Sequence, residues 1–259
     1  MIEVKNLCAY YGKNCVFKNV SFKIEDGSFV ALCGKNGAGK STLLSLIDGI
    51  IPEGLSIDGE IFIDGKNIFS LKRKEIAKRI SFLVQNEKPV WNMTVKQFVQ
   101  TGLYSFESMS KMQIDSLVNK SLEKFCLSSF SDKLIFNISG GEFQKCRLAR
   151  SFVQSSDVLL FDEPSENLDL PFQSQLMTIL KNFSEGDSKK IVIFSIHDLN
   201  VASTFCEDFI LFSKNEVIAN SREKIFTKEV LEKAYDSKVK IFVHPVLDVL
   251  QVLFLYSNF

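Results

Sequence analysis

The chain has 259 residues, of which 46% are hydrophobic, and its 31 Lys and Arg balance its 31 Asp and Glu. This length and hydrophobic content predict one large domain with a substantial core. The balanced charge provides no overall field that would attract nucleic acid, so no nucleic-acid partner is expected. With no apolar run of about 18 residues and no signal-type N-terminus, we expect a cytoplasmic chain without a membrane span.

The first predicted element is a β-hairpin. Residues 2–10 and 16–24 alternate and are rich in β-forming residues, and the sequence Gly-Lys-Asn at 12–14 between them is typical of a turn. The apolar run 29–33 then predicts a buried strand.

The next stretch, from Gly34 to Thr42, reads G-K-N-G-A-G-K-S-T and is followed by a helix-like run from Leu43. This is a full P-loop in the strand–loop–helix context that the motif requires. Its glycines let backbone N–H groups converge on phosphates at a helix N-terminus. Lys40 is expected to reach the outer phosphates, and the Ser41 hydroxyl to bind Mg²⁺. The expected nucleotide-binding residues here are Gly34, Asn36, Gly37, Ala38, Gly39, Lys40, Ser41 and Thr42.

Beyond the P-loop, residues 59–65 predict a short hairpin strand. The basic run 71–79 predicts a helix with a solvated face, and it leads into a buried strand at 80–85. Residues 94–103 and 111–127 carry apolar residues at helical spacing.

Strand patterns return at 158–163, at 191–196 and in a late hairpin at 209–212 and 216–218, with a helix near 173–180. The segment 239–259 is interpreted as a final strand with a capping segment. Strands alternating with helices predict an α/β fold with a largely parallel sheet. We therefore expect a single domain over 1–259: a core formed by 1–85 and 157–259, and an inserted helical subdomain at 86–156.

Polar residues end three of the predicted strands, and in a parallel sheet these ends meet at one edge. Asp162 is suited to hold Mg²⁺, and Glu163 to polarise an attacking water. Gln85 can touch both the metal's water shell and that water. His197 can donate to a γ-phosphate oxygen. We expect Lys40, Gln85, Glu163 and His197 to be catalytic, and Ser41, Gln85 and Asp162 to serve the metal.

A second anion-binding pattern follows at 138–142, Ile-Ser-Gly-Gly-Glu, before a helical run at 143–153. A hydroxyl and two glycines at a helix N-terminus suit a phosphate. A single bound nucleotide is not expected to use two phosphate-binding sites on the same protomer. Two protomers facing head to tail, each completing the other's pocket, would resolve this.

These motifs, in this order and over nearly the whole chain, resemble the ATP-binding subunit of an ABC transporter. The resemblance implies a P-loop NTPase core that hydrolyses ATP with Mg²⁺. It implies that Ser139, Gly140, Gly141 and Glu142 form the signature motif acting on the opposite subunit's ATP, and that Asp169, in the sequence Glu-Asn-Leu-Asp at 166–169, communicates across the dimer. It also implies that Tyr11 stacks on adenine, with Tyr10 as the competitor.

The resemblance further implies a homodimer at the cytoplasmic face of the inner membrane, with integral-membrane permease subunits and, indirectly, a substrate-binding protein as partners. A groove near 85–102 would receive a coupling helix, with Trp91 either lining the groove or lying in the core.

Residues 94–104, the His-Asp-Leu-Asn run at 197–200 and residues 226–231 are similar to the siderophore, haem and cobalamin importer subgroup, although Leu103 replaces an Arg usual there. The alternatives are an ABC ATPase for another cargo, a soluble ABC ATPase without a membrane partner, and a regulatory module that no longer hydrolyses ATP.

Overall fold

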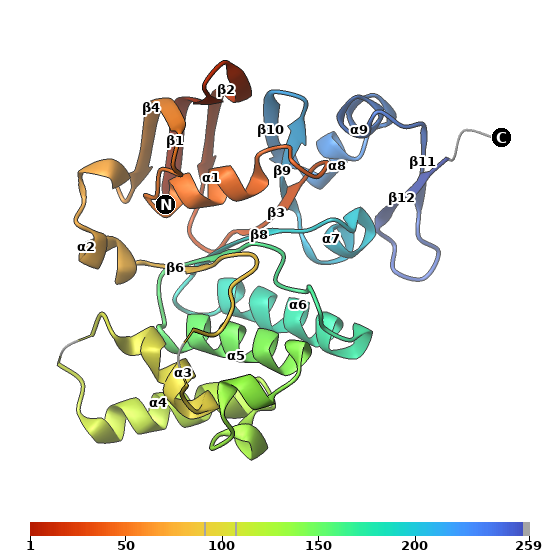
Figure 1. The fold of residues 1–259 in the computed structure, drawn as a ribbon. Helices are drawn as coiled ribbons and strands as arrows, with labels where there is room; N and C mark the ends of the chain where they lie inside the picture. Colours follow the sequence, from red (N-terminus) through yellow and green to blue (C-terminus); the bar gives the residue numbers. More distant parts are fainter. Residues whose placement is uncertain (91, 107, 256–259) are drawn as a thin grey trace.

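The computed structural model describes residues 1–90, 92–106 and 108–255, and a six-stranded sheet in the order β10-β9-β3-β8-β7-β6 lies at its centre (Figure 1). Neighbouring strands from β9 to β6 run parallel, and β10 pairs antiparallel with β9 at one edge. The strands are β3 Phe29–Cys33, β6 Ile80–Leu83, β7 Val158–Phe161, β8 Ile191–Ser195, β9 Asp208–Ser213 and β10 Glu216–Ser221. The predicted α/β class with a parallel sheet is confirmed.

A second, four-stranded sheet has the order β2-β1-β4-β5. Its strands are β1 Ile2–Tyr11, β2 Asn14–Ile24, β4 Leu55–Ile63 and β5 Lys66–Asn67. The antiparallel pairing of β1 with β2 confirms the predicted N-terminal hairpin. The strand predicted at 59–65 begins earlier, at Leu55, because β4 also pairs with β1, from Ile63 opposite Ile2 to Leu55 opposite Tyr11.

Helix α1 (Lys40–Ile47) lies between the two sheets, while α5 (Gly140–Val153) and α6 (Leu170–Glu185) cover the other face of the six-stranded sheet (Figure 1). The side chains of β3 alternate accordingly. Val30 and Leu32 pack in the core on the α1 side, and Ala31 and Cys33 pack in the core on the α5 and α6 side. This strand is buried on both faces, as expected for a central parallel strand, and it delivers the P-loop from a rigid support.

Between β6 and β7 the chain forms α3 (Val95–Gln100), α4 (Lys111–Lys124) and α5, as the helical spacing predicts. Thr94 and Ser110 cap α3 and α4 with reciprocal capping boxes. The rings of Phe98 on α3 and Phe143 on α5 lie 5.5 Å apart. The remaining α-helices are α2 Arg73–Ala77, α7 Leu199–Phe205, α8 Arg222–Ile225 and α9 Lys228–Tyr235, and short 3-10 helices span Ile68–Ser70, Thr101–Leu103, Ser128–Phe130 and Ile135–Asn137.

The C-terminal segment contains two strands rather than the single final strand predicted. β11 (Val239–Val243) and β12 (Leu250–Phe254) pair antiparallel. His244 Nδ1 accepts the backbone N–H groups of Val246 at 3.2 Å and Leu247 at 3.1 Å, and this turn reverses the chain. The predicted capping segment extends over residues 256–259, which lie outside the described residues. Within the described ranges, no helix combines the length and apolarity needed to cross a membrane.

Candidate nucleotide-binding and catalytic site

The P-loop connects the end of β3 to the first turn of α1, as its sequence predicts. Gly39, the residue before α1, has a left-handed φ of 104°, and a Cβ built on it would lie 2.6 Å from Cγ1 of Val16. A side chain at this position would therefore collide with β2 and also strain the backbone. The absence of a side chain lets the loop turn closely under the β1–β2 hairpin.

Lys40 occupies the floor of this loop and is only 6% exposed. Its Nζ donates to the carbonyl oxygens of Gly34 at 2.8 Å and Lys35 at 3.1 Å. Burial lowers the pKa of Lys40, and the negative charges of Glu163 and Asp162 are among the effects that oppose this shift. An ammonium group whose hydrogen-bond acceptors are neutral carbonyls, at a helix N-terminus, fits an anionic phosphate.

A cavity of about 480 Å³ opens above the loop. Most of the residues that the sequence predicts for the site meet in it. Its lining consists of Tyr11, Val16, Asn36, Gly37, Gly39, Lys40, Ser41, Thr42, Gln85, Glu163 and His197. Tyr11 rather than Tyr10 lines the cavity. Of the other predicted positions, Gly34, Ala38 and Asp162 flank it without forming its wall, while Ser139, Gly140, Gly141, Glu142 and Asp169 lie on other elements and do not line it.

Asp162 is buried at the end of β7, where Ser195 of the neighbouring strand β8 holds it. The Ser195 hydroxyl donates to Oδ1 of Asp162 at 2.7 Å and accepts the backbone N–H of Glu163, also at 2.7 Å. One hydroxyl therefore fixes both consecutive acidic residues. The second carboxylate oxygen of Asp162 and the hydroxyl of Ser41 are hard oxygen donors of the kind that Mg²⁺ prefers.

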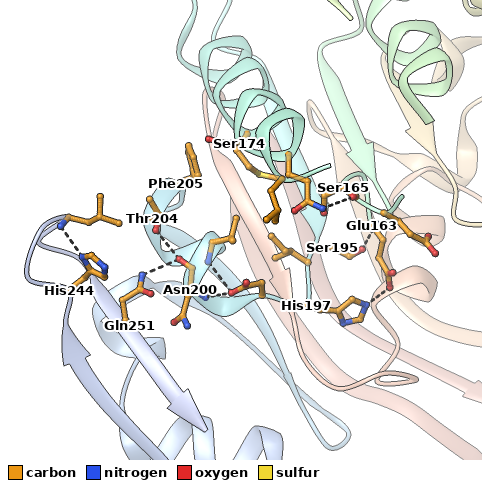
Figure 2. A pocket seen from close by; sticks show the side chains of 18 of the residues that line it. Glu163, Ser165, Ser174, Ser195, His197, Asn200, Thr204, Phe205, His244 and Gln251 are labelled. Carbon is orange, nitrogen blue, oxygen red and sulfur yellow. Dashed lines mark hydrogen bonds and ion pairs between the residues drawn. The ribbon is translucent and has the colours of Figure 1, made fainter. Parts of the chain in front are cut away.

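Glu163 and His197 contact each other directly (Figure 2). Oε1 of Glu163 lies 2.6 Å from Nε2 of His197, and Glu163 has a left-handed φ of 52°. Such a backbone conformation is uncommon for a residue with a side chain and is often found at functional sites. The pair also borders a second cavity of about 560 Å³, which extends between α6, α7 and the turn of the C-terminal hairpin (Figure 2).

The Ser-Gly-Gly-Glu motif begins α5. The Ser139 hydroxyl accepts the N–H of Glu142 at 3.3 Å, and Oε2 of Glu142 accepts the N–H of Ser139 at 2.6 Å. The hydrogen bonds from Ser139 lower the pKa of Glu142. Asp169 likewise caps α6, its Oδ1 accepting the N–H of Phe172 at 2.9 Å, and Asp198 caps α7. Each motif therefore has a local structural task besides the function that the sequence predicts.

The sequence does not predict the contacts of two groups of residues near the site. Ser195 ends the apolar strand β8 just before the predicted His197, so its polar position at a buried strand end was an available signal. The second group consists of Glu87, Gln144, Arg147 and Arg150. Arg147 and Arg150 join α5 to Glu87 in the segment after β6, and Gln144 joins α5 to the Pro164 carbonyl. Glu87 lies 63 residues from Arg150, and no local pattern indicates their contact.

Comparisons with known proteins agree with this geometry. Residues 17–166 match the ABC transporter family. The chain is 35% identical over 244 residues to the petrobactin import ATP-binding protein YclP of Bacillus subtilis, covering 93% of this chain and 95% of that protein. It is 30% identical over 251 residues to the hemin import ATP-binding protein HmuV of Idiomarina loihiensis, covering 94% of each.

Among solved structures, the chain resembles the dimeric structure of MJ0796, a bacterial ABC transporter cassette. The TM-score is 0.74 at 29% identity, and the match covers 85% of this chain and 98% of that one. The P-loop cavity, the acidic pair after β7 and the family match together show that the chain belongs to the ABC transporter family, as an ATP-binding subunit that hydrolyses ATP.

Proposed function

We propose that the chain powers an importer for a metal chelate of the siderophore, haem or cobalamin type. The observation that supports a transport ATPase most directly is the cavity in which Lys40, Gln85, Glu163 and His197 meet. The cargo class is supported by the similarity to the petrobactin and hemin import ATP-binding proteins, which extends over more than nine-tenths of the chain.

In this proposal each residue of the cavity has one task. Lys40 and the P-loop N–H groups bind the β- and γ-phosphates of ATP, and Tyr11 stacks on the adenine ring. Ser41, Gln85 and Asp162 would hold Mg²⁺, which would supply charge stabilisation for the transferred phosphoryl group. Glu163 accepts a proton from the attacking water, and His197 donates to a γ-phosphate oxygen. His197 contacts only Oε1 of Glu163, so Oε2 of the same carboxylate can serve the water.

The pocket is completed by a second copy of the chain. The signature residues at the start of α5 lie away from the chain's own P-loop cavity: Ser139, Gly140, Gly141 and Glu142. The N-terminus of α5 is therefore available to a neighbouring protomer. The dimeric assembly of the similar cassette MJ0796 supports this arrangement. Asp169 then communicates across the interface. ATP would hold the two copies together, and loss of the bridging γ-phosphate would let them part.

A partner permease would dock on the helical side of the molecule, placing the chain peripherally at the cytoplasmic face of the inner membrane, with a substrate-binding protein acting indirectly. We assign residues 86–156 to one helical subdomain that moves in the cycle. A cavity of about 250 Å³ lies within the predicted groove, between the segment after β6 and helices α3 and α5, and is suited to a coupling helix. Trp91, which the sequence places either in this groove or in the core, lies outside the described residues.

Affinity purification of the tagged chain from detergent-solubilised native membranes tests the transport role. We expect a multi-span permease to co-purify, together with ATP-dependent phosphate release. Purification of an active ATPase without any membrane protein would contradict the importer and favour a soluble ABC ATPase. Uptake of labelled chelates by cells lacking the chain then distinguishes the proposed cargo from others.

A further inference from the structure

The segment that carries Gln85 is tied to α5 by a carboxylate that the sequence did not single out. Glu87, two residues after Gln85, accepts two parallel hydrogen bonds from Arg150, at 2.5 Å to Oε1 and 2.6 Å to Oε2. Its Oε2 also lies 3.3 Å from Nε of Arg147. Bidentate pairing of this kind fixes direction as well as distance. The segment after β6 is therefore held in a defined position on α5.

Arg147 extends this connection toward the proposed catalytic base. Its side chain is 7% exposed, and it donates to the Val84 carbonyl and, at 2.6 Å, to Oε1 of Gln144. Gln144 in turn donates to the Pro164 carbonyl at 2.9 Å. Val84 immediately precedes Gln85, and Pro164 immediately follows Glu163. Side chains of α5, the helix that begins with the signature motif, thus hold the backbone next to Gln85 and next to Glu163.

The outer end of this network is accessible. Glu87 and Arg150 both line the cavity of about 250 Å³ to which the proposed function assigns the permease. The inner end, formed by Gln144 and Arg147, is buried. A buried charged network is costly unless it is fully paired, so disturbing its outer end should alter the geometry of the inner end.

We propose that Glu87 is a positioning residue that couples the occupant of this groove, and the orientation of the signature helix, to the placement of Gln85 and Glu163. The identity of the groove's occupant in this inference rests on the proposed function. The effect of Glu87 on hydrolysis by the isolated chain is independent of the proposed function.

Steady-state hydrolysis by the purified chain tests the inference. Glu87→Gln keeps the size and polarity of the side chain but removes the charge. We expect kcat to fall about tenfold, the effect of losing one well-placed interaction of 1.4 kcal/mol, while the ATP affinity stays unchanged because the P-loop cavity does not include Glu87. Arg150→Lys, which loses the bidentate geometry and keeps the charge, should act in the same direction.

The matched control is Asp115→Asn. It removes the 2.8 Å ion pair between Lys96 and Asp115, which joins α3 to α4 in the same helical region but lies outside the network. Its kcat should equal that of the parent. If the Glu87 and Arg150 variants are folded and retain the parent kcat, with only a lowered melting temperature, Glu87 merely stabilises the fold and the inference is wrong.

A second arm uses the complex with the co-purified permease. Glu87→Gln should still co-purify, yet lose most of the permease's stimulation of hydrolysis. Full stimulation of this variant would overturn the inference. If no permease co-purifies with the parent, the proposed transport function fails, while the kcat of the isolated variants still decides the role of Glu87.

Discussion

Nε2 of His197 lies 2.6 Å from Oε1 of Glu163, although 34 residues separate the two in the chain. The parallel register of β7 and β8 causes this contact, because both side chains follow the carboxyl ends of neighbouring strands. Glu163 is 19% exposed and His197 is 46% exposed, so the pair is open to the P-loop cavity. The proposed base is therefore held beside the position that a γ-phosphate would occupy.

Glu163→Gln should leave ATP binding intact and lower turnover by about 10²-fold or more. The amide keeps the shape of the side chain but cannot accept the proton of the attacking water. Phosphate release measures the turnover, and titration calorimetry measures the binding. Normal turnover in this variant would show that another group is the base.

Ser195→Ala should disturb the site without touching the nucleotide. It removes the donor to Asp162 and leaves the N–H of Glu163 without its acceptor, which costs about 1–3 kcal/mol of unfolding free energy for buried groups. We also expect a lowered kcat. Denaturant unfolding and phosphate release measure the two effects.

Ser184→Ala is the matched control for this substitution. Ser184 is also buried, but its hydroxyl donates only to the Lys181 carbonyl within α6. The kcat of the control should be that of the parent. Equal effects of both substitutions on kcat would argue against a specific role for Ser195.

Lys40→Ala should reduce nucleotide affinity itself, because the Lys40 ammonium is the buried cation at the floor of the cavity. Lys233→Ala, which removes an exposed ion pair with Glu216, should bind ATP like the parent. Titration calorimetry compares the two. Unchanged affinity in Lys40→Ala would contradict the assignment of the phosphate site.

The buried carboxyl of Asp48 is expected to make the stability of the folded chain depend on pH. Burial raises its pKa from 3.8 to about 6, against the opposing effect of its ion pair with Arg73. Because the folded state holds this proton more tightly than the unfolded state, the stabilisation is complete below pH 3.8 and is lost as the pH rises through 6. The loss is on the order of 3 kcal/mol.

The unfolding free energy of the wild type minus that of Asp48→Asn should therefore fall between pH 4 and pH 7, because the variant lacks the titrating group. Denaturant titrations at each pH measure this difference. A difference that stays constant or rises with pH would show that Asp48 does not bind its proton more tightly in the folded chain.

The sequence predicts those parts of the fold and the site that depend on local pattern. The P-loop, the polar residues ending β6, β7 and β8, and Ser139 at the start of α5 are each visible within a short stretch. Because parallel strands end at the same edge of a sheet, the sequence alone also predicts that Gln85, Glu163 and His197 lie close together.

The rest depends on contacts between distant segments. The bridge from Ser195 to Asp162 requires the register of β7 with β8. Arg73 lies on the solvated helix face that the sequence predicts, but its pairing with the buried Asp48 at 2.5 Å joins segments 25 residues apart and is not indicated by a local pattern. The sequence does not predict the second C-terminal strand because β12 carries both a buried Gln251 and an exposed Leu253, which obscures the alternation of a half-buried strand.

We expect each hydrolytic pocket to need two copies of the chain. A crystal structure of Glu163→Gln with ATP and Mg²⁺ would show whether it does. We predict a head-to-tail dimer in which Ser139 and Gly141 of one copy contact the γ-phosphate held by the P-loop of its partner. A structure in which both residues remain far from every bound triphosphate would contradict the account.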